Sequence, residues 1–509
     1  MNTTAFKAIF AGILSCFIIY PEHIRAQEPG TIPWTPKSSG DLRAATISVP
    51  SKYSSIALDP SVHKVNVPEG WTASVFFAGS RLGKPRFMSW GPDSVLFVAN
   101  MNAGNVLALP DVNRDGIADT MIVAAGGFSY GHDVRFWGDT MYVCQEAGIV
   151  KLWRSDKSSY VFNNRVTVVD KSSQPNQTGG NHRTRTLVVD TLRRKFVVSV
   201  GSRGNADREL NRAIIEEYEF DGSGRHTVAT GVRNAVGLTL HPRTGAIWAN
   251  NNGSDNQGND VPPEWVDIVR DGGFYGYPYA YHYQRYFTFT GDYQDLLPIT
   301  RADSMLVQSM VPPAALVTSH CAPMALVFTD FTPIEEHRYG AFMAMRGSWN
   351  RNPLSGAKIV FLEFDNDADT IANVVRDFCT GFINDTTNVA TRWGRPVGLA
   401  VSADGSVFVS VDEGKQMILK LTPPKGVASV RGTTEVQPVV YPNPANENIT
   451  IECGPSLGRI RMVSALGNVV IDVPLEHRSV TIDTRNLPSG MYTLHVPGYS
   501  APTNVVVVH

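Results

Sequence analysis

The sequence has few cysteines, and those it has lie far apart. None of the five forms a Cys-x-x-Cys pair or a Cys-x-x-Cys-His motif, so the sequence does not favour an attached haem. Cys16 lies in an apolar N-terminal segment, and the others are Cys144, Cys321, Cys379 and Cys453. We expect either a disulfide between Cys321 and Cys379 or isolated buried thiols.

An excess of charge of either sign is also missing. The chain has 45 Lys and Arg against 47 Asp and Glu, a formal net charge of −2, and its basic residues are not clustered. Nucleic-acid-binding domains usually carry a basic patch or stripe. We therefore expect no nucleic-acid partner.

Long apolar runs are confined to the N-terminus. Residues 8–20 form an apolar segment after Lys7, and Ala26 precedes Gln27 at a position suited to cleavage. A membrane-spanning helix needs about 20 apolar residues, so we interpret residues 1–26 as a secretory signal peptide and not as an anchor. We expect export and no transmembrane anchor.

Glycine and proline, by contrast, are plentiful. With 44 Gly, 32 Pro and 43% hydrophobic residues, the composition is typical of a turn-rich, all-β protein. Six imperfect repeats of apolar runs and polar turns predict a six-bladed β-propeller over residues 69–425, with long insertions in the fourth and fifth repeats. Residues 27–68 are expected to form an extended segment over this domain.

The composition changes after Pro423. We expect a linker at residues 426–437 and a small C-terminal β-sandwich at residues 438–509. Short apolar runs separated by turns, among them Gly467-Asn468, support this second all-β unit.

One loop resembles part of a calcium-binding motif. Asp111, Asn113, Asp115 and Asp119 alternate with other residues, but Ile122 stands where a calcium loop needs a bidentate Glu. The loop is either a structural calcium site or a hairpin stabilised by Asx hydrogen bonds.

Strongly polar residues stand just before several predicted inner strands. His182, Arg233 and Arg395 each precede, by a few positions, a Leu that opens an apolar run. In a closed ring of sheets such residues converge on one axis. Our hypothesis is that they form a functional site at one mouth of the ring.

Further motifs accompany these residues in a fixed order. They are Gly231-Val-Arg233-Asn234, Asn252-Gly253-Ser254-Asp255, Gly272-Gly-Phe-Tyr-Gly276, Arg346-Gly-Ser-Trp349-Asn-Arg351 and Gly394-Arg395-Pro-Val-Gly. Together, over about residues 70–423, they resemble the soluble quinoprotein sugar dehydrogenases, especially the sorbosone and pyranose branch. The resemblance implies a six-bladed propeller that binds pyrroloquinoline quinone (PQQ) and Ca²⁺ at one end of its channel.

The resemblance also implies roles for individual residues. His182 corresponds to the general base, and Arg233 lies beside it at the reacting centre. The expected cofactor-binding residues are Arg233, Asn234, Arg346, Arg351, Arg395 and His320. The expected metal ligands are Gly253, Ser254 and Asp255, with Asp260 and Glu264 as acidic neighbours.

These residue types suit the implied cofactor. PQQ is a flat ortho-quinone with three carboxylates, and guanidinium groups pair with carboxylates in a planar, bidentate way. Calcium takes oxygen ligands and acts as a Lewis acid on a carbonyl. An imidazole base contributes a factor of about 10² to 10⁴ to such a reaction.

Two positions depart from the family pattern. Ser202 stands where glucose-oxidising relatives have an Asp that orients the histidine, and a hydroxyl does not favour imidazolium as a carboxylate does. Arg346 stands where the sorbosone branch commonly has His. Both departures bear on substrate and rate.

The C-terminal unit carries a second resemblance. Tyr441-Pro-Asn-Pro444, the Gly467-Asn468 turn and Leu487-Pro-Ser-Gly490-Met-Tyr resemble the sorting domain of type IX secretion cargo. This implies outer-membrane passage by the type IX machinery and delivery to the cell surface or medium. The alternative is a small carbohydrate-binding or adhesive sandwich.

The sequence as a whole therefore predicts an exported oxidoreductase. It would oxidise a sugar or a related alcohol or aldehyde by hydride transfer to PQQ, with an external electron acceptor. One alternative is a non-catalytic surface propeller that binds glycan or protein. Another is a calcium-dependent, lactonase-like hydrolase, which would need more acidic side chains around the channel. The substrate, the acceptor, surface attachment and the oligomeric state stay open.

Overall fold

The computed structural model describes residues 34–329, 334, 337, 339–424, 438–452, 458–464, 469–475, 479–496 and 503–509. The expected signal peptide, linker 426–437, Cys453 and the Gly467-Asn468 turn lie outside these residues.

Six sets of four antiparallel strands follow one another along residues 72–422 of the described chain. The first set is β5 (Pro85–Trp90), β6 (Leu96–Asn100), β7 (Asn105–Leu109) and β8 (Ile122–Gly126); the second is β9 (Asp133–Trp137), β10 (Thr140–Gln145), β11 (Gly148–Trp153) and β12 (Asn164–Asp170). The third is β13 (Leu187–Asp190), β14 (Lys195–Val200), β15 (Ile214–Glu219) and β16 (His226–Thr230); the fourth is β17 (Leu238–Leu240), β18 (Ile247–Asn251), β19 (Glu264–Ile268) and β23 (Ala315–Val317). The fifth is β24 (Pro323–Phe328), β25 (Gly340–Met345), β26 (Lys358–Glu363) and β27 (Val374–Cys379); the sixth is β28 (Gly394–Val401), β29 (Val407–Gly414), β30 (Met417–Thr422) and β4 (Thr72–Phe77).

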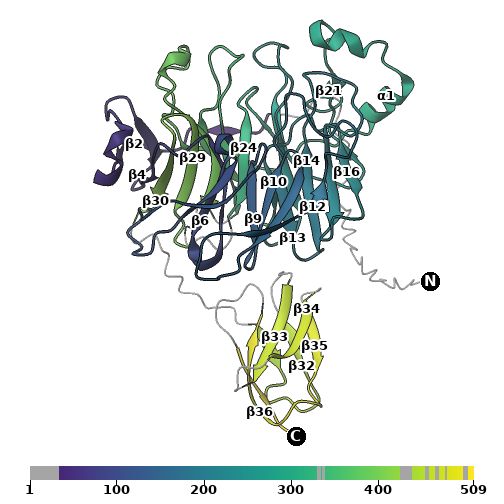
Figure 1. Cartoon of the computed structure of the whole chain (residues 1–509). Helices are drawn as coiled ribbons and strands as arrows, with labels where there is room; N and C mark the ends of the chain where they lie inside the picture. Colours follow the sequence, from purple (N-terminus) through teal and green to yellow (C-terminus); the bar gives the residue numbers. More distant parts are fainter. Residues whose placement is uncertain are drawn as a thin grey trace, which may run out of the picture.

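These sheets close into a ring, and the domain is a β-propeller. The first strand of each set contacts the first strand of the next, and β28 contacts β5 to complete the cycle. The sixth set takes three strands from the end of the domain and β4 from its beginning, because β4 pairs antiparallel with β30. Figure 1 shows strands from several of these sheets side by side.

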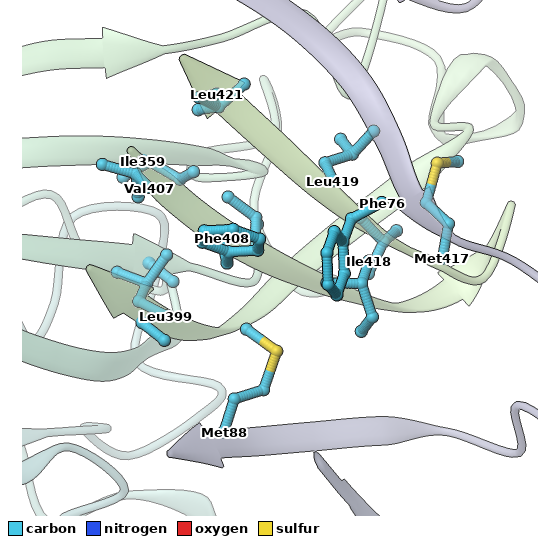
Figure 2. Packing of buried hydrophobic residues seen from close by; sticks show 14 of the residues in the cluster. Phe76, Met88, Ile359, Leu399, Val407, Phe408, Met417, Ile418, Leu419 and Leu421 are labelled. Carbon is cyan, nitrogen blue, oxygen red and sulfur yellow. The ribbon is translucent and has the colours of Figure 1, made fainter. Parts of the chain in front are cut away.

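The ring is closed by apolar packing as well as by strand pairing. Figure 2 shows Phe76 of β4 beside Phe408 of β29, together with residues of β5, β26, β28 and β30. The Phe76 and Phe408 rings are perpendicular, with centroids 4.9 Å apart. Burying each such side chain contributes roughly 1.5–3 kcal/mol, so residues from both ends of the domain stabilise the closure.

A hydrogen bond between neighbouring sheets explains the repeated Val-Gly-Leu motif. Ser410 Oγ accepts from Gly398 N–H and donates to the carbonyl of Arg86 on the next sheet (2.7 Å each). Asn250 makes the same bridge, from Gly237 N–H to the carbonyl of Met324. A Cβ at Gly398 or Gly237 would lie within 2.3 Å of an atom of this bridge, so both sites require glycine.

Additional elements extend the ring. The N-terminal strands are β1 (Lys37–Ser38), which pairs with β27, and the hairpin of β2 (Leu42–Ser48) and β3 (Lys64–Pro68). The insertion between β19 and β23 holds β20 (Gly273–Phe274), β21 (Ala280–Tyr281), β22 (Arg285–Tyr286) and α1 (Arg301–Gln308), which stands at the upper right in Figure 1. Short 3₁₀ turns cover Ser51–Ile56, Pro92–Ser94, Met101–Ala103, Gly291–Leu296 and Val389–Thr391.

The C-terminal unit has two sheets that share one buried cluster. One contains β31 (Val439–Tyr441), β32 (Asn448–Glu452) and β35 (Ser479–Asp483); the other contains β34 (Val469–Leu475), β33 (Gly458–Ser464), β36 (Gly490–His495) and β37 (Thr503–Val507). Ile449 and Ile451 of the first sheet pack in the same cluster as Ile460 and Leu494 of the second.

The structure bears on the cysteines, the 111–119 loop and the membrane helix considered from the sequence. Cys144, Cys321 and Cys379 are free and buried, so the Cys321–Cys379 disulfide is not formed. The 111–119 loop is held by Asx hydrogen bonds, in which Asp111 accepts from Asp115 N–H and Gly116 N–H. Among the described residues, no helix is long and apolar enough to cross a membrane.

Candidate functional site

A cavity of about 370 Å³ is lined by segments from all six sheets. Its lining includes eight residues predicted from the sequence: His182, Arg233, Asn234, Gly253, Asp255, His320, Arg346 and Arg395. Ser254 lies beside them, almost completely buried. The tertiary structure thus brings together positions up to 213 residues apart in the chain.

His182 is fixed through one nitrogen of its ring. Nδ1 lies 2.9 Å from Ser202 Oγ and 3.0 Å from the Ser202 carbonyl oxygen. The Ser202 hydroxyl donates its hydrogen to the Gly204 carbonyl (2.8 Å), so both oxygens can only accept from Nδ1. His182 therefore carries its proton on Nδ1 and leaves Nε2 with a free lone pair.

The surroundings keep this imidazole neutral. Desolvation, followed by the positive charge of Arg233, lowers the pKa of His182 to about 3, and Arg212 and Arg185 act in the same direction. The hydrogen bond to Ser202 opposes this shift without reversing it. At neutral pH the ring is an unprotonated base.

Buried arginines also hold the loop that carries His182. Arg212 donates to the carbonyls of Gly201, Ser202 and His182. Arg185 donates to the His182 carbonyl as well. Both guanidinium groups are buried, so they fix the histidine through its backbone rather than contact a ligand.

Arg233 lies among oxygen acceptors on the adjoining wall. Its guanidinium donates to the carbonyls of Asn205 and Gly253 and forms an ion pair with Asp255 at 3.1 Å. Asp255 also accepts from Asn350 at 2.8 Å. These contacts position Arg233 and order the 252–255 turn.

Glu264 is a buried carboxyl group on the same wall. It accepts from Gly253 N–H, and burial raises its pKa to about 8 even though Gly253 and Arg233 act in the opposite direction. A cation beside Glu264 would remove the cost of ionising it.

The opposite wall contains an arginine cluster, formed by Arg86, Arg346 and Arg395 around Asp412 and Glu413. Asp412 accepts from Arg86 at 2.6 Å and from Arg346 at 3.0 Å, and Glu413 accepts from Arg346 at 2.6 Å and from Arg395 at 3.3 Å. Burial raises the pKa of Asp412, but Arg86 and Arg346 outweigh this effect and hold it below its usual value.

The cluster has three positively charged guanidinium groups and two carboxylates, so it has one surplus positive charge. Lys84 adds a further positive charge on the same wall. Over the whole cavity, the described lining has six cationic side chains (Lys84, Arg86, Arg183, Arg233, Arg346 and Arg395) and two acidic ones (Asp255 and Glu264). Such a lining favours an anion.

Two predicted residues have other contacts. Arg351 is absent from the lining: its guanidinium donates to the carbonyls of Asn259 and Pro353 and pairs with Asp260 at 2.9 Å. His320 does line the cavity, but its Nε2 donates to the Gly258 carbonyl at 2.9 Å. Both therefore brace the 253–260 loop.

Several residues in or beside the cavity were not predicted from the sequence. Lys84 and Arg86 open the first repeat as Arg395 opens the sixth, so their position in the sequence could have predicted that they line the cavity. Asp412 and Glu413 gave no such signal, because they stand at the end of the apolar strand β29, and Arg86 and Arg346 reach them from other sheets. Arg183 reaches the cavity from beside His182 and lies over the Tyr130 ring at 3.9 Å.

Comparison with known protein families gives two matches. The family described as TrAA12-like matches residues 65–421, and the family described as secretion system C-terminal sorting domain matches residues 439–507. The first covers most of the chain and the second nearly all of the C-terminal unit.

Curated relatives align with the chain over a similar share of its length. The chain is 27% identical over 421 residues to the pyrroloquinoline quinone-dependent pyranose dehydrogenase of Coprinopsis cinerea, in an alignment that covers 70% of this chain and 55% of that protein. It is 24% identical over 384 residues to an uncharacterized protein of Borreliella burgdorferi, covering 71% and 92%. The chain thus spans little more than half the length of the Coprinopsis enzyme.

Solved structures share the fold. The holo PQQ domain of the Coprinopsis cinerea pyranose dehydrogenase matches with a TM-score of 0.57 at 24% identity, covering 70% of this chain and 97% of that domain. The soluble aldose sugar dehydrogenase of Escherichia coli, in its apo form, matches with a TM-score of 0.51 at 15% identity, covering 69% and 99%. At these identities the structures establish the propeller fold alone.

Proposed function

The chain belongs to the TrAA12-like family, and on that premise we propose that it is an exported quinoprotein oxidoreductase. Its six sheets would be the blades of a six-bladed propeller that oxidises a sugar or a related alcohol or aldehyde with PQQ and Ca²⁺. Electrons would pass to an external acceptor. The C-terminal unit would be a β-sandwich that directs the protein through type IX secretion to the cell surface or medium.

The observation that carries the proposal is the cationic cavity. A tricarboxylate supplies three negative charges, and the arginine cluster has a surplus of positive charge beside Lys84. Arg395 and Arg346 would hold carboxylates of PQQ, because a guanidinium pairs with a carboxylate through two parallel hydrogen bonds. Arg233 and Asn234 would lie against the cofactor on the His182 side.

The turn at Gly253, Ser254 and Asp255 fits the proposed Ca²⁺. Calcium binds carbonyl and carboxylate oxygens, and this turn supplies both. The Gly253 carbonyl accepts from Arg233 at 2.6 Å and keeps a second lone pair for a cation. Glu264 would become ionised beside the metal and help to neutralise it.

His182 would act as the general base. It would remove a proton from the substrate hydroxyl through Nε2, since Nδ1 already carries a hydrogen that is bound by Ser202. PQQ, when bound, supplies the two-electron acceptor for the hydride that leaves the same carbon. Ser202 and Arg212 keep the ring in place while the proton is transferred.

The experiment is a titration of the purified protein with PQQ, with and without Ca²⁺, followed by absorbance and then by dye reduction with a series of aldoses. We expect saturable binding, with turnover that is lost on chelation and restored by Ca²⁺. The variant Arg485→Gln should behave as wild type. Arg485 lies in the C-terminal unit, where it pairs with Asp483, and it does not line the cavity. Absence of quinone binding would reject the proposal.

A further inference from the structure

Asn205 lies in the loop that follows β14, three residues after the Ser202 that binds His182. It is not among the residues that line the first cavity. Its side chain is partly buried and contacts three other parts of the chain. These parts are Arg233, the 252–255 turn and the insertion between β19 and β23.

All four hydrogen-bonding positions of the Asn205 amide are used. Its oxygen Oδ1 accepts from Arg233 Nη2 at 3.0 Å and from Asp255 N–H at 2.8 Å. Its nitrogen Nδ2 donates to the Asp255 carbonyl at 3.1 Å and to Asp292 Oδ2, in the insertion, at 2.7 Å. A carboxamide has two acceptor and two donor positions, so this set of contacts is complete.

These partners fix the orientation of the amide. Rotating it by half a turn would place the Nδ2 hydrogens against the donors of Arg233 and Asp255, and the oxygen against two acceptors. An aspartate at this position would keep the acceptor oxygen. Its second oxygen would then face the Asp255 carbonyl and the Asp292 carboxylate, neither of which can donate. The position therefore favours a neutral amide.

The amide joins Arg233 to the turn proposed to hold Ca²⁺. Arg233 Nη1 donates to the Gly253 carbonyl, and Nη2 pairs with Asp255. Without Asn205 Oδ1, Nη2 would lose one of these two acceptors and Asp255 N–H would lose its acceptor. Asn205 therefore holds the guanidinium and the backbone of the turn in one arrangement.

The loop that carries Asn205 also connects Arg233 with His182. Ser202 N–H donates to the Arg233 carbonyl at 2.7 Å, and the Ser202 oxygens accept from His182 Nδ1. Arg208, in the same loop, pairs with Asp303 of α1 at 2.8 Å, so the insertion helps to hold the loop. One loop thus positions the imidazole through Ser202 and the guanidinium through Asn205.

We propose that Asn205 is a positioning residue for the first cavity. Its amide keeps the Arg233 guanidinium beside the carbonyl and carboxylate oxygens of the 252–255 turn. Asn205 acts through Arg233 and Asp255, since it does not line the cavity itself. The consequence for PQQ and Ca²⁺ rests on the proposed function, whereas the positioning of the turn does not.

The first test is amide hydrogen exchange of the cofactor-free, full-length protein, resolved to single residues. Asp255 N–H should be protected in the wild type. It should exchange about ten-fold faster in Asn205→Ala, because its hydrogen-bond acceptor is lost. Asn205→Asp keeps an acceptor oxygen and should keep the protection. Gly253 N–H donates to Glu264 and is the internal reference, so its exchange should not change.

The second test is absorbance titration with PQQ in the presence of Ca²⁺. Asn205→Ala should weaken PQQ binding by about ten-fold or more, because groups that orient the residues around a metal typically contribute about ten- to a hundred-fold to affinity or activity. Asn164→Ala is the matched control. The Asn164 amide donates to Ser155 at 2.8 Å, and Asn164 does not line the cavity, so this variant should bind PQQ as the wild type does.

Three results would overturn the proposal. They are equal protection of Asp255 N–H in the wild type and Asn205→Ala, loss of protection in Asn205→Asp as large as in Asn205→Ala, or equal PQQ affinity in Asn205→Ala and Asn164→Ala. Failure of the wild-type protein to bind PQQ would instead reject the proposed function. The exchange rates would still decide whether Asn205 positions the turn.

Discussion

The two walls of the first cavity differ in how their ionisable side chains are paired. In the arginine cluster, guanidinium and carboxylate groups compensate one another, and Asp412 is ionised although it is buried. On the His182 side, the ring contacts a hydroxyl and a carbonyl, while Arg233, Arg212 and Arg185 raise the cost of protonation. One wall therefore suits binding of an anion, and the other suits a neutral base.

This difference arises because one wall has carboxylate partners for its cationic groups and the other has none for its histidine. Buried charges persist only when they are paired, so the cluster needs Asp412 and Glu413. His182 has no carboxylate partner in the described structure, and it therefore stays uncharged. Four substitutions test the contrast, beginning with the largest expected effect.

His182→Ala should remove the base and leave the binding wall intact. We expect turnover to fall by about 10² to 10⁴, because a positioned general base contributes that factor. The dissociation constant of PQQ should change little. Steady-state dye reduction and absorbance titration measure the two quantities. His226→Ala, in an exposed histidine that pairs with Asp271, is the matched control, and equal turnover in both variants would contradict the role of His182.

Asp412→Asn should damage the binding wall and affect the fold. The substitution leaves Arg86 and Arg346 without their shared buried carboxylate, which typically costs about 3–5 kcal/mol of stability. Urea unfolding of the propeller measures this loss. Asp271→Asn, in an exposed carboxylate that pairs with exposed His226, should shift the curve little. Similar curves for the two variants would show that Asp412 is not needed to compensate the arginines.

Arg395→Met should weaken cofactor binding and spare the base. Arg395 donates to the Gly347 carbonyl at 2.5 Å and pairs with Glu413, so its charge is only partly compensated. Loss of one charge-assisted contact to a carboxylate should weaken PQQ binding by about ten- to a hundred-fold. The absorbance titration gives this ratio. A larger effect on turnover at saturating PQQ than on affinity would contradict the division between the walls.

Ser202→Asp should give His182 a carboxylate partner, as the arginines of the other wall already have. His182 accepts a proton only when neutral, and with a pKa of about 3 it is neutral throughout the usual assay range, so wild-type activity should show no acid limb near pH 6.5. A carboxylate at position 202 favours imidazolium and should raise this pKa by about 1–3 units. The acid limb then moves upward toward neutral pH.

Imidazole ¹⁵N shifts of the cofactor-free protein measure the same titration without activity. In the wild-type protein they should report a proton on Nδ1 and a neutral ring down to at least pH 5. Ser202→Ala is the matched control, since it removes the acceptor hydroxyl without adding charge. A wild-type ring that titrates near pH 6.5 would contradict the neutral-base assignment.

Local patterns in the sequence were informative about the fold. The Leu that opens an apolar run after His182, Arg233 and Arg395 predicted strands at equivalent places in the ring, and Leu187, Leu238 and Leu399 lie in the first strand of their sheets. The Tyr441-Pro-Asn-Pro444 opening predicted the sorting domain in the same way. Both signals are local, since each depends on a few neighbouring residues.

The candidate site was only partly predictable. Position before an inner strand predicted His182, Arg233 and Arg395, and all three line the cavity. Arg351 was expected from the family resemblance; its guanidinium pairs with Asp260, and it does not line the cavity. Of the two alternatives for Cys321 and Cys379, the structure has the buried free thiols. Side-chain direction and pairing depend on neighbours that are distant in the chain.

The sequence by itself determined that the chain is rich in β-structure, that polar groups precede its inner strands, and that a sorting unit follows. Only the tertiary structure decided which arginines are balanced by Asp412 and Glu413, that His182 holds its proton on Nδ1, and that the N-terminal segment bridges the fourth and fifth sets of strands. The physical reason is that strand patterns arise from the alternation of adjacent residues. Charge pairing and hydrogen-bond direction, however, arise where segments far apart in the chain meet.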